Sequence, residues 1–273
     1  MIALHARRSA ESIHAWASQR PDKPLIVVLT GTDLYRDIQK DASAKQSLHL
    51  ATHLVVLQEA GLAVLPVEVQ YKARVIFQSA SRLKPAVKPL NRFMAVMVGH
   101  LRDEKDPLTF MKAAQLCDAP PIFYQQIGDG LDASLADAAR LTAVDQPNYT
   151  WLGGLPRAQT RQHIKRAHVL VNSSIMEGGA HVILEAVQSG TPVLASRISG
   201  NVGMLGPDYA GYFEVGDAAA LAALVRRCAA EPAFLVHLQN QCARRAELFD
   251  PALEKRLVLN LMASAMKETH EHA

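Results

Sequence analysis

The sequence is poor in cysteine, has few aromatic residues and contains no long apolar run. Its three cysteines, Cys117, Cys228 and Cys242, form no CxxC pair, which argues against a disulfide framework and a zinc site and predicts three buried thiols. No stretch approaches the roughly 18 apolar residues of a membrane span. The first residues reach Arg7 and Arg8 before an apolar core develops, so we expect a cytoplasmic protein without integral membrane contact.

An excess of charge of one sign is also missing. The 29 Lys and Arg residues nearly balance the 26 Asp and Glu residues, and they are scattered along the chain, which argues against an extended nucleic-acid surface. With 49% hydrophobic and 20% charged residues, the 273-residue chain can bury a full core, which excludes disorder and leaves room for two modest domains.

Short β-branched runs alternate with longer helical patterns through most of the chain. This alternation predicts parallel sheets covered by helices, an α/β fold. The expected strands lie at 1–5, 25–30, 53–57 and 74–78 in the first part and at 93–98, 122–127, 149–152, 168–172 and 192–196 in the second.

The two sets of strands predict two domains. We expect an N-terminal domain at 1–80, a Pro-containing basic linker at 81–92 and a complete nucleotide-binding type of domain at 93–250. Residues 251–273 are expected to form a helix that packs back on the N-terminal domain.

The loop that follows the strand at 93–98 has the sequence GHLRDEKDP. Ligands of open parallel sheets bind outside the carboxyl ends of the strands, so this loop is a candidate site. Gly99 would allow a ligand close to the backbone, and Lys105 with Arg102 or His100 would meet phosphate oxygens. A solvated polar loop, with Asp106 as the cap of the next helix, is an equally good interpretation.

The loop after the strand at 168–172 is the stronger signal, with the sequence SSIMEGGAHVILEA. Gly178 and Gly179 remove side chains just before a helix that is expected to begin near Ala180, so its free N–H groups can bind a diphosphate without a metal. Glu177 can accept hydrogen bonds from sugar hydroxyls, and Glu185 can reach a ribose diol. Glu177 can also be a generic loop acid. Glu185 lies among apolar residues, where an ionised side chain is costly unless it has a binding role.

Two glutamates seven residues apart, between a strand rich in small residues and an SGTPVLAS segment, resemble the retaining glycosyltransferases of the two-domain B architecture. The resemblance implies two Rossmann-like domains, with Glu177 on the donor sugar, Glu185 on the ribose and Lys105 on the diphosphate. The backbone of residues 178–182, which includes Ala180, His181 and Val182, would hold the diphosphate and sugar.

This sequence departs from the family at one position of the phosphate site. The family usually has arginine after the strand-ending glycine, where this chain has His100, so Arg102 would take its place. Glu177, Lys105 and Arg102 are then the expected catalytic residues. The chain has no Asp-x-Asp triplet, so we expect neither a metal nor another cofactor.

A narrower resemblance covers nearly the whole chain, through ALHARRSAESI, LTGTDLYRDI, LVVLQEAGL, RVIFQSA, VGHLRDEKDPLTF and the SIMEGG segment. These segments are similar to the selenosugar synthases of selenoneine biosynthesis. The resemblance implies transfer of an N-acetylglucosamine-like hexose from a UDP-sugar to selenophosphate. The alternatives are an ordinary hexosyltransferase with a sugar or lipid acceptor, and a non-catalytic protein that binds nucleotide sugars.

The N-terminal motifs fit a small anionic acceptor. His5, Arg7 and Arg8 follow the first strand, while Thr30, Gly31, Thr32 and Asp33 follow the second and open a helix. Cations and a helix N-terminus in these loops would attract an anion. Surface arginines, and Thr32 or Asp33 acting only as a helix cap, explain the same residues equally well.

The resemblance also bears on the first domain. The N-terminal domain of this architecture normally begins with an earlier strand and a glycine-rich loop, so we expect a truncated domain with an uncovered sheet edge. Such an edge would favour a homo-oligomer.

Overall fold

The computed structural model describes residues 1–117 and 121–271. The chain divides into two compact units. Unit 1 comprises Met1–Ser79, Met176–Ala180 and the chain from Leu248 onward, and unit 2 comprises Ala80–Ile175 and His181–Glu247. Both units are built on parallel sheets, as the sequence predicts for an α/β fold.

Unit 1 contains a four-stranded sheet of order β1-β2-β3-β4, and each strand overlaps its predicted range. The fourth strand begins one residue before the predicted range of 74–78 and ends already at Val75. The strands are β1 (Ile2–Leu4), β2 (Ile26–Val28), β3 (His53–Val56) and β4 (Ala73–Val75). The helices are α1 (Ala10–Gln19), the π-helical turn η1 (Asp33–Asp37), α2 (Ile38–Lys40), α3 (Ala42–Leu50), the 3-10 helix η2 (Glu59–Val64), α4 (Val67–Gln70) and α12 (Pro251–Glu271).

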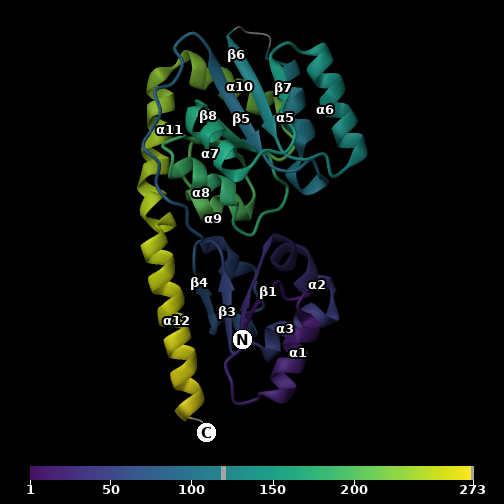
Figure 1. Cartoon of the computed structure of the whole chain (residues 1–273), viewed down its shortest axis with the longest axis vertical. Helices are drawn as coiled ribbons and strands as arrows, with labels where there is room; N and C mark the ends of the chain where they lie inside the picture. Colours follow the sequence, from purple (N-terminus) through teal and green to yellow (C-terminus); the bar gives the residue numbers. More distant parts are fainter. Residues whose placement is uncertain (118–120, 272–273) are drawn as a thin grey trace. The chain divides into compact units, whose positions relative to one another are not determined.

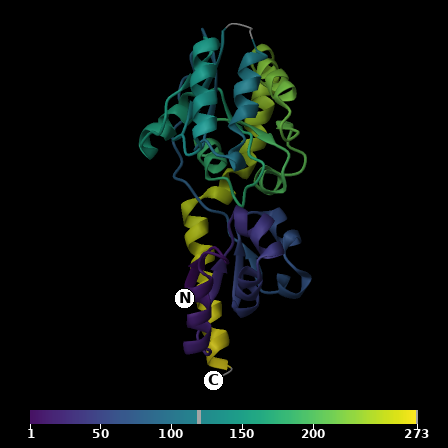
Figure 2. The same cartoon turned by 90° about the vertical axis from the view of Figure 1, so that its right-hand side faces the viewer.

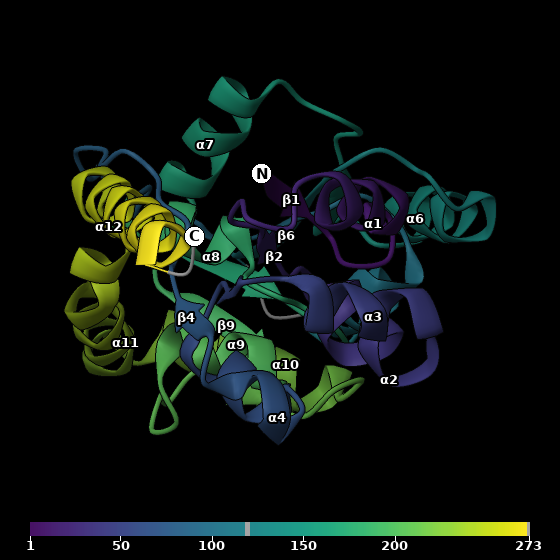
Figure 3. The same cartoon turned by 90° about the horizontal axis from the view of Figure 1, so that it is seen from below.

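The two faces of this sheet pack against different helices. Val27 points to the face that packs with Ile13 of α1 and Leu48 of α3. The neighbouring residue Ile26 points to the opposite face and packs with Leu261 of α12. The alternation follows from the period of two in a β-strand. Figure 3 shows α1 and α3 beside one another and α12 apart from them.

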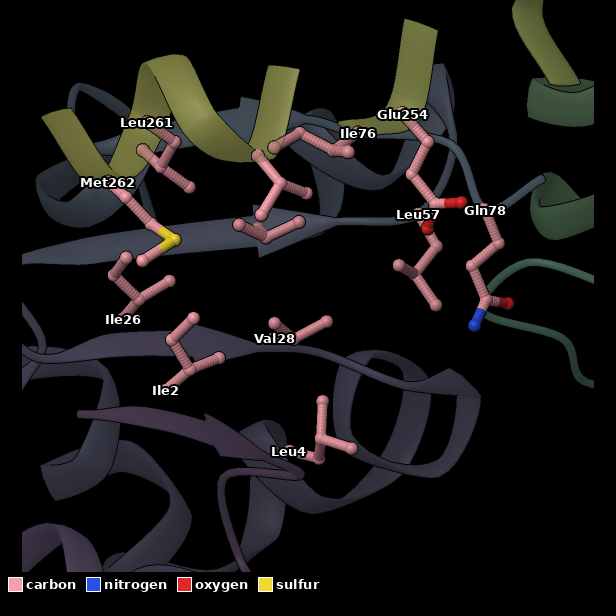
Figure 4. Close-up of a pocket in the computed structure, with 12 residues that line it drawn as sticks. Ile2, Leu4, Ile26, Val28, Leu57, Ile76, Gln78, Glu254, Leu261 and Met262 are labelled. Atoms are coloured by element: carbon pink, nitrogen blue, oxygen red, sulfur yellow. The ribbon is translucent and has the colours of Figure 1, made fainter. Parts of the chain in front are cut away.

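Helix α12 and the sheet enclose a largely apolar cavity of about 180 Å³ (Figure 4). Glu254 and Gln78 line it together with aliphatic side chains. Ile2 and Leu4 of the edge strand β1 also line it and are 50% and 64% exposed. The face of this sheet is therefore better covered near β3 and β4 than near β1.

Unit 2 contains a six-stranded sheet of order β10-β9-β8-β5-β6-β7. Five strands lie where the sequence predicts them, and the two-residue edge strand β10 was too short to be predicted. The strands are β5 (Phe93–Val98), β6 (Ile122–Ile127), β7 (Tyr149–Trp151), β8 (Val169–Asn172), β9 (Val193–Ser196) and β10 (Tyr212–Phe213).

Helices connect these parallel strands and form two groups. Helix α5 packs with α6 and α10, whereas α8 packs with α7 and α11 (Figures 1 and 2). The helices are the 3-10 turn η3 (Asp103–Lys105), α5 (Pro107–Gln115), α6 (Ala133–Asp145), α7 (Arg157–Arg166), α8 (His181–Val187), α9 (Ser199–Leu205), α10 (Ala218–Ala230), α11 (Pro232–Arg245) and the 3-10 helix η4 (Ala246–Phe249).

Aspartates set the start of three helices in unit 2. Asp106 accepts a hydrogen bond from the Thr109 amide at the start of α5, so this residue is the predicted helix cap. Asp132 and Asp217 cap α6 and α10 in the same way. Asp106 adopts the left-handed conformation with φ 44°, which turns the chain sharply between η3 and α5.

The three cysteine thiols are free and buried, as predicted. Burial raises the pKa of Cys242 to about 11, so this thiol stays protonated near neutral pH. Among the described residues, no helix combines the length and the apolar character that a membrane crossing requires.

The first prediction concerns the α12 face of unit 1. Replacing the buried Leu261 by alanine should destabilise unit 1 by about 2–4 kcal/mol, because the substitution leaves a cavity against Ile26, Val55 and Ile76. Chemical denaturation followed by circular dichroism measures the loss. Leu259 lies on the same helix and is 52% exposed, so Leu259→Ala is the matched control and should change stability by less than about 0.5 kcal/mol. Equal effects of the two substitutions would contradict this packing.

Candidate functional site

The loops after β5 and β8 meet where the order of strands in unit 2 reverses. The chain runs outward from β5 through β6 to β7, then returns to the other side of β5 with β8. Ser173 joins the two loops, because its buried hydroxyl lies 3.0 Å and 2.9 Å from the carbonyl oxygens of Lys105 and Asp106. Ligands of doubly wound sheets bind at such a reversal point. The start of the loop after β8 and the end of the loop after β5 are therefore joined at this point of unit 2.

The glycine loop after β5 holds Lys105 against the backbone. A Cβ atom built on Gly99 would lie 3.4 Å from both Cγ and Cδ of Lys105, so the aliphatic stem of this lysine passes directly over the glycine. Arg102 is half exposed and its Nε lies 3.9 Å from a carboxylate oxygen of Glu104. The structure thus brings Gly99 and Lys105 together, as a shared role in phosphate binding requires.

His100 connects the β5 loop to the loop after β6. Its Nδ1 accepts a hydrogen bond of 3.1 Å from the amide of Asp129 and lies 3.5 Å from a carboxylate oxygen of the same residue. A histidine with these contacts orders the loop. This contact describes what the residue does at the position where an arginine was expected.

Gly128 makes the close approach of these two loops possible. It has φ 150°, and a Cβ atom at this position would lie 2.0 Å from the carbonyl oxygen of Gly99. No side chain fits at that distance. Sequence reasoning missed this residue, although a glycine directly after a predicted strand is the signal that would have found it.

Glu185 is a buried acid beside an arginine and a histidine. Its side chain is 7% exposed, and Oε1 accepts a hydrogen bond of 3.1 Å from Nε of Arg157. His181 Nδ1 lies 3.4 Å from the same oxygen, one helical turn away. Burial alone would raise the pKa of Glu185, but the His181 and Arg157 contacts outweigh it and hold the pKa below its usual value. The carboxylate is therefore charged at neutral pH.

The glycines after Glu177 pack closely against two other loops of unit 1. A Cβ atom on Gly178 would lie 2.4 Å from the backbone nitrogen of Gly31, and one on Gly179 would lie 2.7 Å from Cβ of Leu57. Residues predicted to hold the donor and the acceptor are thus in backbone contact. Glu177 itself is 9% exposed, and helix α8 begins at His181, one residue later than expected.

His5 lies at the centre of a polar cluster at the carboxyl ends of β1 and β2. Its Nδ1 contacts a carboxylate oxygen of Asp33, and its Nε2 lies 2.9 Å from the Thr32 hydroxyl. Asp33 also accepts a hydrogen bond of 3.1 Å from the Thr30 amide. Burial lowers the pKa of His5 and raises that of Asp33, while the attraction between the two groups opposes both shifts.

His5 adopts φ 75°, a conformation that costs a non-glycine residue about 1–3 kcal/mol. Such strain is typical of functional positions. The Thr32 side chain makes no capping hydrogen bond, and Asp33 accepts from Thr30, on its N-terminal side. The Thr30 carbonyl accepts the first helical hydrogen bond, from the Leu34 amide, so the bond from the Thr30 amide to Asp33 is a capping-box contact. Asp33 therefore caps the helix and also contacts His5.

Two arginines of this cluster, Arg7 and Arg36, share one acidic partner. Asp37 accepts hydrogen bonds of 2.9 Å from Arg7 Nε and 3.0 Å from Arg36 Nε. Burial opposes ionisation of Asp37, but these two bonds prevail and lower its pKa. Arg8 is exposed, and its amide lies 3.2 Å from His5 Nδ1. Sequence reasoning missed Asp37, although it lies four residues after Asp33.

His5, Asp33 and Asp37 also form a group that could hold a metal, since their ligand atoms lie within 4.8 Å of one another. Arg7 and Arg36 bind Asp37 directly and place two positive charges beside the position of such an ion. Repulsion from these guanidinium groups opposes a divalent cation here.

Comparison with known proteins gives a family and a fold. Residues 81–249 match the family described as glycosyl transferases group 1. TuaC of Bacillus subtilis (strain 168) is 25% identical over 227 residues, which are 76% of this chain and 55% of TuaC. Glycosyltransferase 1 domain-containing protein 1 of Xenopus tropicalis is 28% identical over 164 residues, 59% of this chain and 46% of that protein. The chain spans about half the length of both relatives.

Two solved structures share the fold at low sequence identity. Anabaena Alr3699/HepE, in complex with UDP and glucose, has a TM-score of 0.79 and 18% identity, over 96% of this chain and 77% of that one. Sucrose-phosphate synthase from Thermosynechococcus elongatus has a TM-score of 0.74 and 21% identity, over 96% of this chain and 73% of that one.

The second prediction tests the contact between the β5 and β6 loops. Gly128→Ala should destabilise unit 2 by roughly 3 kcal/mol or more, because the new methyl group collides with the Gly99 carbonyl. Gly216 has φ 79° and no neighbour within 4 Å, so Gly216→Ala provides the cost of backbone strain alone, about 1–2 kcal/mol. Thermal and urea unfolding of the two variants measure the difference. A Gly128→Ala protein as stable as Gly216→Ala would show that the loops lie further apart.

Proposed function

The chain belongs to the glycosyl transferases of group 1, and on that premise we propose that it transfers a hexose from a UDP-sugar to a small acceptor. The main support is the reversal point of the unit 2 sheet. There Ser173 joins the β5 and β8 loops, and helix α8, which follows the second loop, contains the buried Glu185. The neighbour HepE has UDP and glucose in its crystal structure, which agrees with this choice of donor.

Each part of the donor has a proposed partner. Glu185 accepts hydrogen bonds from the ribose diol, since an ionised carboxylate is a strong acceptor for paired hydroxyls. Lys105 and Arg102 bind the diphosphate, Glu177 contacts the donor sugar, and backbone amides of residues 178–182 complete the site. No metal is required in this proposal, because the two cationic side chains carry the charge of the diphosphate.

The chemical step breaks the bond between C1 of the sugar and the diphosphate oxygen. Negative charge then develops on the leaving group, and Lys105 and Arg102 stabilise it in the transition state. The acceptor atom forms the new bond to C1. Contact between Gly31 and Gly178 supports transfer over binding alone, because it joins the loop proposed for the acceptor to the loop proposed for the donor sugar.

For the acceptor we propose selenophosphate, on the basis of the resemblance in the HARR and TGTD segments. Selenium is already a strong nucleophile, so positioning against C1 suffices without a general base. One observation favours a second candidate, transfer to a sugar hydroxyl. Arg7 is already paired with Asp37, so an anion has to compete for it, whereas the carboxylates and His5 suit a hydroxyl acceptor.

The third prediction tests the donor site. Glu185→Gln and Lys105→Ala should each weaken UDP binding by about tenfold or more, since each removes a charge-assisted contact worth about 1.5–3 kcal/mol. Isothermal titration calorimetry measures both affinities. Glu231 is an exposed acid of unit 2 that pairs with Arg227, so Glu231→Gln is the matched control and should bind UDP like the parent. Parent-like binding by both Glu185→Gln and Lys105→Ala would refute the donor assignment.

The fourth prediction tests the acceptor. The protein is incubated with UDP-N-acetylglucosamine and either selenophosphate or a sugar alcohol, and the products are identified by mass spectrometry. We expect a selenium-containing sugar and UDP in the first reaction. Efficient transfer to the sugar alcohol without a selenium product would establish the second candidate, and UDP-sugar binding without any turnover would indicate a binding protein.

A further inference from the structure

Two arginines and a histidine approach a single oxygen of Glu185. Arg157 Nε lies 3.1 Å from Oε1, His181 Nδ1 lies 3.4 Å from it and Arg161 Nε lies 4.0 Å from it. Among the residues that the structure describes, the ion-pair contacts of this carboxylate all end on Oε1. The second oxygen, Oε2, is therefore the one left to accept a hydroxyl group in this arrangement.

These three side chains differ in how firmly they are held. The side chain of Arg161 is 14% exposed and donates from Nη2 to the carbonyl of Ser81 at 2.6 Å. His181 is 38% exposed and is fixed on the same helix as Glu185. Arg157 is 68% exposed and is the first residue of α7, so its guanidinium group can leave with little loss of buried contact.

The number of lone pairs on the Glu185 carboxylate limits how many hydrogen bonds it can accept from the ribose hydroxyls. Each carboxylate oxygen accepts about two hydrogen bonds. With Arg157 and His181 on Oε1, one ribose hydroxyl can bind Oε2, but a diol that binds across both oxygens needs a free position on Oε1. Withdrawal of Arg157 provides that position at the smallest cost, because ion pairs with exposed partners contribute little.

We propose that Arg157 is a specificity-determining residue that occupies the ribose position on Glu185 in the empty site. It withdraws when the 2′- and 3′-hydroxyls bind together, so Arg157 lowers the affinity for a complete ribose diol and leaves the affinity for a deoxyribose unchanged. This inference rests on the proposed nucleotide role of Glu185.

The test compares UDP with 2′-deoxy-UDP. A deoxyribose presents one hydroxyl, which Oε2 accepts while Arg157 stays in place. Arg157→Ala should therefore strengthen UDP binding by about two- to fivefold, the equivalent of a weak ion pair, and change 2′-deoxy-UDP binding by less than about 1.5-fold. Titration calorimetry of the full chain gives both affinities.

The exposed pair of Arg227 and Glu231 provides the matched control. Arg227 Nε lies 2.9 Å from its partner, a geometry close to that of Arg157, but on helix α10. Arg227→Ala should leave both affinities unchanged. Thermal unfolding of Arg157→Ala, expected to match the parent, verifies that the exposed substitution leaves the fold intact.

Two results would overturn the inference alone. Weaker UDP binding by Arg157→Ala would show that Arg157 contacts the nucleotide, and an equal change for UDP and 2′-deoxy-UDP would show a general effect of charge. If the parent protein binds neither ligand, the proposed donor function fails as well.

Discussion

The adjacency of β5 and β8 is the constraint on which the proposed site depends. Ala95 and Val169 pair in register although a complete set of strands and helices separates them in sequence. Because both strands run parallel, their carboxyl ends open at the same edge, and the Ser173 hydroxyl fixes the two loops there. Lys105 and the chain leading to Glu185 thereby reach one site.

The second requirement is that loops approach one another at positions without a side chain. Gly128 lies against the Gly99 carbonyl, and Gly178 lies against the Gly31 nitrogen, at distances that exclude a Cβ atom. These glycines act through close packing of loops. A phosphate-binding role predicted from a glycine pair alone does not distinguish such packing from ligand contact, since both need the same absence of a side chain.

The two polar clusters differ in their balance of positive and negative charge. In unit 1, Arg7 and Arg36 bind Asp37, so positive and negative charges are largely matched around His5. In unit 2, two arginines and a histidine approach the single carboxylate of Glu185. The first cluster is thus close to neutral, while in the second cluster two arginines face one carboxylate.

The sequence by itself determined the α/β class and the approximate positions of nine of the ten strands that the structure describes, and it offered the Asp106 cap as one interpretation of the loop after β5. The spacing of hydrophobic residues, the turn residues and the ends of strands depend on residues that are close in sequence. They can therefore be predicted from short stretches of the chain. Only the tertiary structure decided that Arg157 and Arg161 face Glu185, that Asp37 neutralises Arg7 and that His100 binds the Asp129 amide. These contacts join segments that are far apart in the sequence and meet only in the fold. Ion pairs between such segments produce no periodic pattern in the sequence.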